Sequence, residues 1–156
     1  MDHKHYMQEA VTAALKGMQN NEGGPFGCVI VKDGKIIGKG NNKVTSTNDP
    51  TAHAEVTAIR DACKNLDSFQ LTGCTIYSSC EPCPMCLGAI YWARPDKVYY
   101  GSTQTDAANI GFDDAFIYKE IPLPYSERSI PFEQLAPEIA IKAFNQWTEK
   151  EDRREY

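Results

Sequence analysis

The stretch CTIYSSCEPCPMCLGAIYWARPDKVYYGS, residues 74–102, decides the fold, because its pattern changes from strand to helix and back. Residues 74–79 form a short, continuous β-type run of the kind found in a buried strand. From Cys83 the sequence predicts a helix, with Pro84 at the first helical position and Pro95 ending it. Residues 97–102 are again typical of a strand. This succession is the pattern of an α/β protein.

The sequence on both sides continues the alternation. Apolar residues recur at helical spacing over residues 6–18, which predicts an amphipathic first helix. Two β-rich runs follow, joined by Asp33 and Gly34, a pair that strongly indicates a hairpin. The segment 47–66 predicts a second helix, with Asp49 as its N-cap and Pro50 at its first position. Later, residues 111–137 predict a proline-rich loop with short helical pieces, and residues 138–150 predict a last helix.

The size and charge of the chain limit its class. It has 156 residues and a formal net charge of −5, which predicts a single acidic domain over residues 1–156. A nucleic-acid partner is disfavoured, because such partners usually require a basic surface. No apolar run approaches the roughly 18 residues needed to span a membrane, and the N-terminus lacks the features of a secretion signal. We therefore expect a cytoplasmic protein with no membrane partner.

Three of the six cysteines, Cys80, Cys83 and Cys86, stand at a strict three-residue interval. In a reducing compartment such a cluster indicates a metal or catalysis more than disulfides. An iron–sulfur cluster of the bacterial ferredoxin type needs a further cysteine four positions after the third, and the sequence has none there. The remaining cysteines stand singly and are typical of small buried hydrophobic residues.

Residues upstream complete a metal site with Cys83 and Cys86. His53 and Glu55 form an H-x-E motif, and Pro82 precedes the C-x-x-C pair. H-x-E followed by P-C-x-x-C is the signature of the zinc-dependent nucleobase and nucleoside deaminases. Zn²⁺ that is held by one histidine and two thiolates keeps its fourth position for water, which is typical of a catalytic site.

The role of Cys80 decides between an open and a closed site. We interpret Cys80 as a structural thiol at a strand end that does not bind the metal. If it joined His53, Cys83 and Cys86, four protein ligands would make a structural zinc module without catalysis. On an ideal helix His53 and Glu55 lie about 200° apart. Both can therefore face one ion only if the ion lies beyond the helix N-terminus.

The predicted site implies a mechanism. Zinc lowers the pKa of its bound water to about 7 and so supplies hydroxide as a nucleophile at neutral pH. That hydroxide would attack a ring carbon that carries an amino group. Glu55 would take the proton of the water and deliver it to the ring nitrogen and the leaving amine.

Four segments together resemble the bacterial guanine deaminases of the cytidine-deaminase-like fold: GGPFG (23–27), NDPTAHAEVTAIR (48–60), SCEPCPMCLGAIYWARPDKVYYG (79–101) and DAANIGFDDAFIYKEI (106–121). The resemblance implies a three-layer α/β/α sandwich around a central five-stranded mixed sheet. It implies hydrolysis of guanine to xanthine and ammonia, a step of purine catabolism. One Zn²⁺ per chain would be held by His53, Cys83 and Cys86, with Glu55 as the proton shuttle.

The same resemblance assigns residues to the substrate. Asn42 matches an asparagine that hydrogen-bonds the ring. Asp114 matches a carboxylate that reaches the edge and amino group of guanine, and Asp113 is the adjacent alternative. Phe26 and Trp92 are candidates for packing against the ring, although isolated aromatic residues are more often part of the core.

The C-terminal segment is implied to act in a neighbouring protomer. By the resemblance, residues 111–156 are exchanged in a homodimer, and Tyr156 helps to close the partner's site. Without the resemblance, the charged end of the chain is typical of a solvated tail.

Two other deaminase activities remain as alternatives. The central motifs also resemble the bacterial tRNA adenosine deaminases, but a folded RNA needs phosphate contacts and a basic surface. Segments 43–49 and 103–116 hold one lysine and several acids, which favours a small neutral base. A deaminase of cytosine or of another small base is a further alternative, because zinc chemistry does not select the ring.

Overall fold

The computed structural model describes residues 2–156, and the chain forms two compact units, Met1–Ala115 and Phe116–Tyr156. Within the described residues no helix is both long and apolar enough to cross a membrane. The prediction of one deaminase domain with an exchangeable segment 111–156 stays a prediction. Each unit is described separately.

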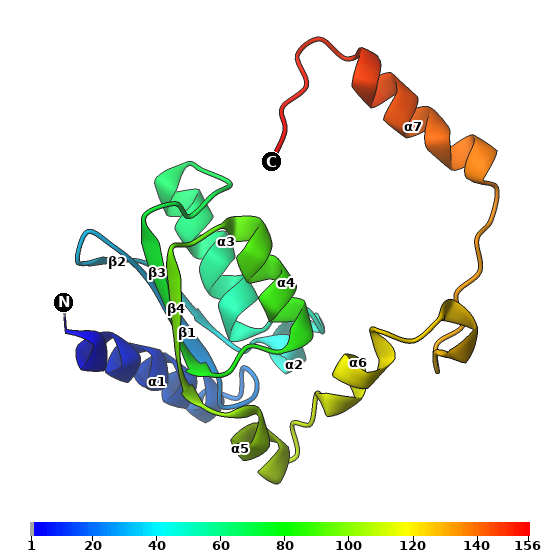
Figure 1. Cartoon of the computed structure of the whole chain (residues 1–156). Coiled ribbons are helices and arrows are strands. Elements are labelled where there is room, and N and C mark those ends of the chain that lie inside the picture. Colours follow the sequence, from blue (N-terminus) through cyan, green and yellow to red (C-terminus); the bar gives the residue numbers. More distant parts are fainter. Residues whose placement is uncertain (1) are drawn as a thin grey trace. The chain divides into compact units, whose positions relative to one another are not determined.

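The first unit is an α/β fold built on a mixed sheet (Figure 1). The strand order is β2-β1-β3-β4, in which β1 pairs antiparallel with β2 and β3, and β3 pairs parallel with β4. The elements are α1 (His3–Gln19), β1 (Gly27–Lys32), β2 (Lys35–Asn41), α2 (Val44–Thr47), α3 (Ala54–Leu66), β3 (Cys74–Cys80), α4 (Pro84–Ala93), β4 (Lys97–Ser102) and α5 (Gln104–Asn109).

Helices cover both faces of this sheet. Along β1, Cys28 and Ile30 belong to the core beneath α3 and α4, whereas Val29 and Val31 pack with the side chains of α1. Successive side chains of a strand point to opposite faces, so this alternation gives three layers, with the sheet in the middle. The predicted α/β class is confirmed.

The expected fifth strand is absent from the described residues, and the sheet has four strands. After β4 the chain enters α5, whose Thr103 and Asp106 form a capping box that starts a helix. Further along, proline interrupts the segment repeatedly and cannot donate a hydrogen bond to a strand ladder. These prolines are Pro122, Pro124, Pro131 and Pro137.

The hairpin between β1 and β2 turns at the predicted residues. Asp33 and Gly34 have φ of 49° and 76°, the left-handed values that a two-residue turn of type I′ requires. The register shifts between Ile30 and Val31, so β2 contains an irregularity at its middle.

Small residues let α3 lie directly on β2. Ala54, Ala58 and Ala62 repeat every four residues on one side of α3 and are fully buried. Opposite them, a Cβ on Gly40 would lie 2.5 Å from Ala58 N and closer still to Ala54 O. Only glycine permits this close approach. The contact therefore sets the position of α3, which begins next to His53.

The predicted start of the second helix is wrong. Asp49 does not cap a helix, because its Oδ1 accepts hydrogen bonds from the backbone N and the hydroxyl of Thr51, at 2.8 and 2.7 Å. These bonds make a local turn of the kind that aspartate favours outside helices. The helix α3 begins only at Ala54, with His53 in extended geometry as its N-cap.

The prediction for α4 is confirmed. Cys83 is its N-cap and Pro84 its first residue, and Arg94 in the left-handed conformation ends it before Pro95.

The second unit is helical where the described chain is regular. It holds α6 (Ala115–Glu120), which starts at the boundary, the 3₁₀ turn η1 (Tyr125–Glu127) and α7 (Pro137–Glu149). The predicted loop with short helical pieces and the predicted last helix are both confirmed. None of the described side chains from 116 to 156 is buried.

Candidate metal centre and active site

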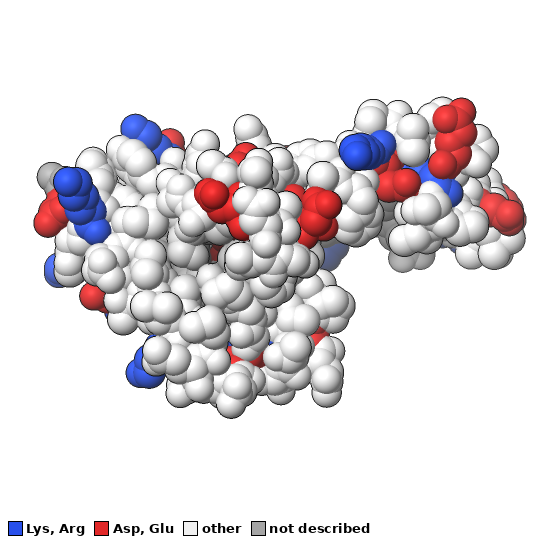
Figure 2. Space-filling view, turned by 90° about the horizontal axis from the view of Figure 1, so that it is seen from below, with Lys and Arg blue, Asp and Glu red and all other residues white. Residues whose placement is uncertain are grey.

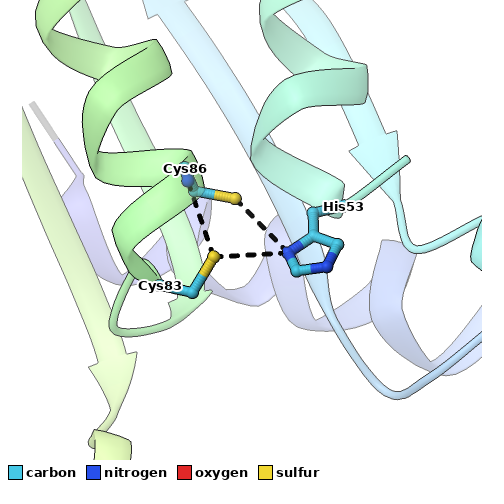
Figure 3. A group of neighbouring side chains, drawn as sticks. All are labelled: His53, Cys83 and Cys86. Carbon is cyan, nitrogen blue, oxygen red and sulfur yellow. Dashed lines mark hydrogen bonds between the residues drawn. The ribbon is translucent and has the colours of Figure 1, made fainter. Parts of the chain in front are cut away.

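His53, Cys83 and Cys86 converge at the N-termini of two helices (Figure 3). His53 is the N-cap of α3 and Cys83 the N-cap of α4, while Cys86 lies in the first turn of α4. His53 Nδ1 is 3.5 Å from both Cys83 Sγ and Cys86 Sγ. The three candidate ligand atoms all lie within 4.8 Å of one another.

These separations fit zinc. Zinc bonds of about 2.3 Å to sulfur and about 2.0–2.1 Å to nitrogen, arranged as a tetrahedron, put nitrogen and sulfur about 3.5 Å apart. Both N···S distances in the cluster are 3.5 Å. The two nitrogen–sulfur separations therefore match two edges of a zinc tetrahedron, and among the described residues the group has three protein ligands.

The two thiols hold their protons unequally. The hydrogen bond with Cys86 is the main cause that lowers the pKa of Cys83 to about 4, and a hydrogen bond with His53 adds to it against the effect of burial. The same bond with Cys83, together with burial, raises the pKa of Cys86. Alone, the pair carries one thiolate. A divalent cation deprotonates the thiols that coordinate it, so it would make both sulfurs charged ligands.

Glu55 lies beside this cluster in a buried position. Its Oε2 is 3.4 Å from Cys86 Sγ, and its Oε1 accepts a hydrogen bond from Ser78 Oγ at 3.1 Å. Burial raises the pKa of the Glu55 carboxyl above its ordinary value, a direction that suits a group that takes and releases protons. His53 is extended and lies outside the helix, so the ideal-helix separation of about 200° does not apply to this pair.

Cys80 stands apart from the cluster. It is the last residue of β3, and its thiol donates to the carbonyl of Thr103 with a separation of 3.7 Å. Burial raises the pKa of Cys80 to about 11, so this sulfur is a neutral thiol. Among the described residues the candidate metal group contains His53, Cys83 and Cys86 without Cys80, which disfavours a closed four-ligand site.

Asn42 is buried and held in one orientation. Its Oδ1 accepts hydrogen bonds from the backbone N of Gly24, at 3.3 Å, and of Val44, at 3.1 Å. Both bonds use the oxygen Oδ1, so they fix the orientation of the Asn42 side-chain amide.

The structure separates the two adjacent aspartates. Asp113 Oδ1 accepts a hydrogen bond from Ala115 N at 2.8 Å, so Asp113 serves the start of α6. Asp114 is half-buried, and burial followed by the negative charge of Cys83 raises the pKa of its carboxyl. The charge of Asp114 in turn contributes to raising the pKa of His53, for which the hydrogen bond with Cys83 is the main cause. Asp114 therefore lies within electrostatic reach of the cluster.

The aromatic candidates are placed differently from one another. Phe26 packs against the core, and its ring meets that of Phe112 edge to face, with centroids 4.9 Å apart. Trp92 is 64% exposed on α4 and lines a surface groove together with Tyr91 and Leu87, and the structure does not bring it to the His53 cluster. Tyr156 belongs to the second unit.

Sequence reasoning missed Ser78, which bonds Glu55, and Phe112, which packs against Phe26. Ser78 is a polar residue in an otherwise apolar buried strand, and that exception was the available signal. Phe112 had no signal of its own, because its contact with Phe26 joins residues far apart in the chain.

The sequence of the chain is similar to known zinc-dependent deaminases. Residues 1–102 match the model of the cytidine and deoxycytidylate deaminase zinc-binding region. The guanine deaminase of Bacillus subtilis (strain 168) is 57% identical over 156 residues, which are 100% of this chain and 100% of that protein. The tRNA-specific adenosine deaminase of Aquifex aeolicus is 39% identical over 102 residues, which are 65% of this chain and 67% of that protein.

Solved structures agree with the sequence comparison. The X-ray structure of guanine deaminase from Bacillus subtilis superposes with a TM-score of 0.97 and covers 100% of this chain and 99% of that chain. A guanine deaminase from Nitrosomonas europaea superposes with a TM-score of 0.67 at 28% identity and covers 70% of this chain and 63% of that chain.

Proposed function

Because the chain belongs to the cytidine and deoxycytidylate deaminase zinc-binding family, we propose that it hydrolyses guanine to xanthine and ammonia. One observation carries the choice of guanine. The likeness to the Bacillus subtilis guanine deaminase extends over the whole chain, whereas the likeness to the tRNA-specific adenosine deaminase stops at 65% of it. The reaction would be a step in the breakdown of purines.

One Zn²⁺ would be held by His53 Nδ1, Cys83 Sγ and Cys86 Sγ, whose separations fit its coordination. When bound, zinc supplies the Lewis acidity that makes water a nucleophile at neutral pH. Glu55 would take one proton of this water and deliver it to the ring nitrogen, and would then carry the second proton of the water to the departing amine. Guanine and one water thus become xanthine and ammonia, and Glu55 returns to its starting state.

Asp114 and Asn42 supply complementary hydrogen bonds to the base. Guanine presents an N1–H and an amine as donors, and the carboxylate of Asp114 accepts from such groups. The Nδ2 amide of Asn42 donates to a lone pair of the purine. A site built to bond a donor can reject an analogue that lacks it by about 10⁴-fold, which separates guanine from adenine. Phe26 and Phe112 provide an apolar surface near Gly24 for the ring.

The charge of the surface also favours a free base over RNA. On the face in Figure 2, basic and acidic side chains are scattered among uncharged ones and form no continuous basic area. Proteins that bind structured RNA gain much of their affinity from lysine and arginine contacts to phosphates.

A substrate panel tests the proposal. The zinc-loaded protein is assayed for ammonia release from guanine, adenine, cytosine and an anticodon-stem RNA. Release from guanine is expected, with the Glu55→Gln variant as the negative control. Release from the RNA or from cytosine, without release from guanine, would overturn the assignment.

The segment 111–156 is proposed to be exchanged within a homodimer, where Tyr156 closes the partner's site. The second unit supports this proposal, because it exposes many large apolar side chains and buries none of the described ones. Apolar surface of this extent is typical of an interface between chains. In α7 these residues are Ile139, Ile141, Phe144 and Trp147. Light scattering tests the expected dimer.

A cytoplasmic location is also proposed. All six cysteines are free, and two of them are needed as thiolates for the metal. A reducing compartment keeps such thiols available.

A further inference from the structure

Ser78 is a residue of the sheet whose side chain contacts the carboxyl group of Glu55. It belongs to β3, where its backbone is aligned with Cys28 of β1 on one side and with Tyr100 of β4 on the other. Its hydroxyl donates to Glu55 Oε1 at 3.1 Å. A strand held by neighbours on both sides is a rigid base for a side chain that orients another group.

Ser78 is a buried polar residue among apolar side chains. It is 2% exposed, and the side chains on the same face of the sheet include Cys28, Ile30 and Ile76, which are fully buried and apolar. A buried hydroxyl in such a place is costly unless it is hydrogen-bonded. The Glu55 carboxylate is the hydrogen-bond partner that the structure shows for this hydroxyl.

The bond makes the two oxygens of Glu55 different. Oε1 is held by Ser78, and Oε2 is the oxygen that lies toward the cluster, 3.4 Å from Cys86 Sγ. If Ser78 did not hold Oε1, the carboxylate plane could turn so that neither oxygen stays directed toward the cluster. Proton transfer requires the carrying atom within hydrogen-bond reach of its donor, so the orientation matters for each turnover.

We propose that Ser78 is a positioning residue of the deamination, which fixes Glu55 so that Oε2 faces the reacting water and the base. This inference rests on the proposed function, because it gives Ser78 a task only if Glu55 shuttles a proton. The hydroxyl of Ser78 bonds the carboxyl of Glu55, and in this proposal Ser78 acts through Glu55 alone.

The main test is a double-mutant cycle. Ser78→Ala is expected to lower kcat by about 10- to 100-fold with little change in KM, the effect of losing one hydrogen bond to a charged group. In the Glu55→Gln variant the side-chain amide cannot shuttle a proton. In that variant the same substitution is expected to change kcat little. An equal loss in both backgrounds would show a merely structural role and overturn the proposal.

Ser79 provides a matched control one residue away. Its side chain points to the opposite face of the sheet, where Oγ accepts a hydrogen bond from Gly27 N at 3.0 Å. Ser79→Ala is expected to lower the melting temperature while kcat stays near that of the wild type. Ser78→Thr keeps the hydroxyl and is expected to retain most of kcat, so a fall as large as that of Ser78→Ala would count against the proposal.

The failure of this inference and of the proposed function can be told apart. All variants are checked for zinc content and assayed with whichever substrate of the panel the wild type turns over. Without release from guanine, the choice of guanine fails, but the cycle is still decided with the other base. If the wild type turns over guanine and Ser78→Ala keeps full kcat, only the role of Ser78 fails.

Discussion

The contact between β2 and α3 makes the metal centre sensitive to a single methyl group on the sheet beneath α3. Gly40 is buried, and a Cβ there would lie 2.5 Å from Ala58 N and nearer still to Ala54 O. Both are backbone atoms, which cannot rotate away as a side chain can. Gly40→Ala must therefore push the first turns of α3 away from the sheet. That turn carries Glu55, and its N-cap is His53.

The expected effect has two parts. Overpacking of a core costs typically about 1–3 kcal/mol, and contact with backbone places this variant at the upper end. For a chain of this length about 3 kcal/mol lowers the melting temperature by about 6–12 °C. A shift of about 1 Å in reacting groups costs about 100-fold in rate. We expect losses of both stability and kcat, measured by thermal melting and by ammonia release.

Gly88→Ala is the matched control. It lies within α4, the other helix of the centre, and a Cβ there would meet no atom within 4 Å. Replacing an unconstrained helical glycine by alanine stabilises by about 0.5–1 kcal/mol, and kcat should not change. If Gly40→Ala melts and turns over like Gly88→Ala, the reasoning that α3 is positioned by its contact with Gly40 is refuted.

Further predictions concern the site and the C-terminus. Glu55→Gln should keep its zinc, measured by metal analysis, while kcat falls by about 10²–10⁴-fold because an amide cannot carry the proton; retention of most activity would disprove the shuttle. Cys83→Ser should lose zinc and activity together, and a chelator should inactivate the wild type in a way that added Zn²⁺ reverses. Asp114→Asn should reduce kcat/KM for guanine by about 100-fold or more, whereas Asp113→Asn should leave it nearly unchanged, since the charge of Asp114 acts on His53 and Asp113 bonds Ala115 N. Removal of the last few residues including Tyr156 should lower kcat with little effect on the melting of the first unit; an unchanged rate would indicate an ordinary tail.

Local signals predicted most of the fold. Pro84 and Pro95 bound α4, and Asp33 with Gly34 turns the hairpin, because each of these effects depends on backbone conformation within a few residues. Where two local signals compete, the prediction failed. Asp49 followed by proline predicts a helix start, yet its side chain bonds Thr51 and makes a turn instead.

The sequence predicts the candidate metal ligands but not which side chains surround them. The H-x-E and C-x-x-C spacings select His53, Cys83 and Cys86, and the structure brings these three together. The sequence does not distinguish Asp113 from Asp114, whereas the structure does: Asp113 Oδ1 accepts a hydrogen bond from Ala115 N, and the charge of Cys83 acts on Asp114. The expected five strands were wrong for the described residues, which form four.

The sequence by itself determined the alternation of strands and helices and the residue types that can hold zinc and carry a proton. These properties follow from the spacing and chemistry of neighbouring residues. Only the tertiary structure decided that His53 meets Cys83 and Cys86, that Ser78 bonds Glu55, that Phe112 meets Phe26 and that Cys80 stays outside the cluster. Each of these depends on contacts between segments distant in the chain, where the close packing of α3 and α4 on the sheet determines which side chains meet.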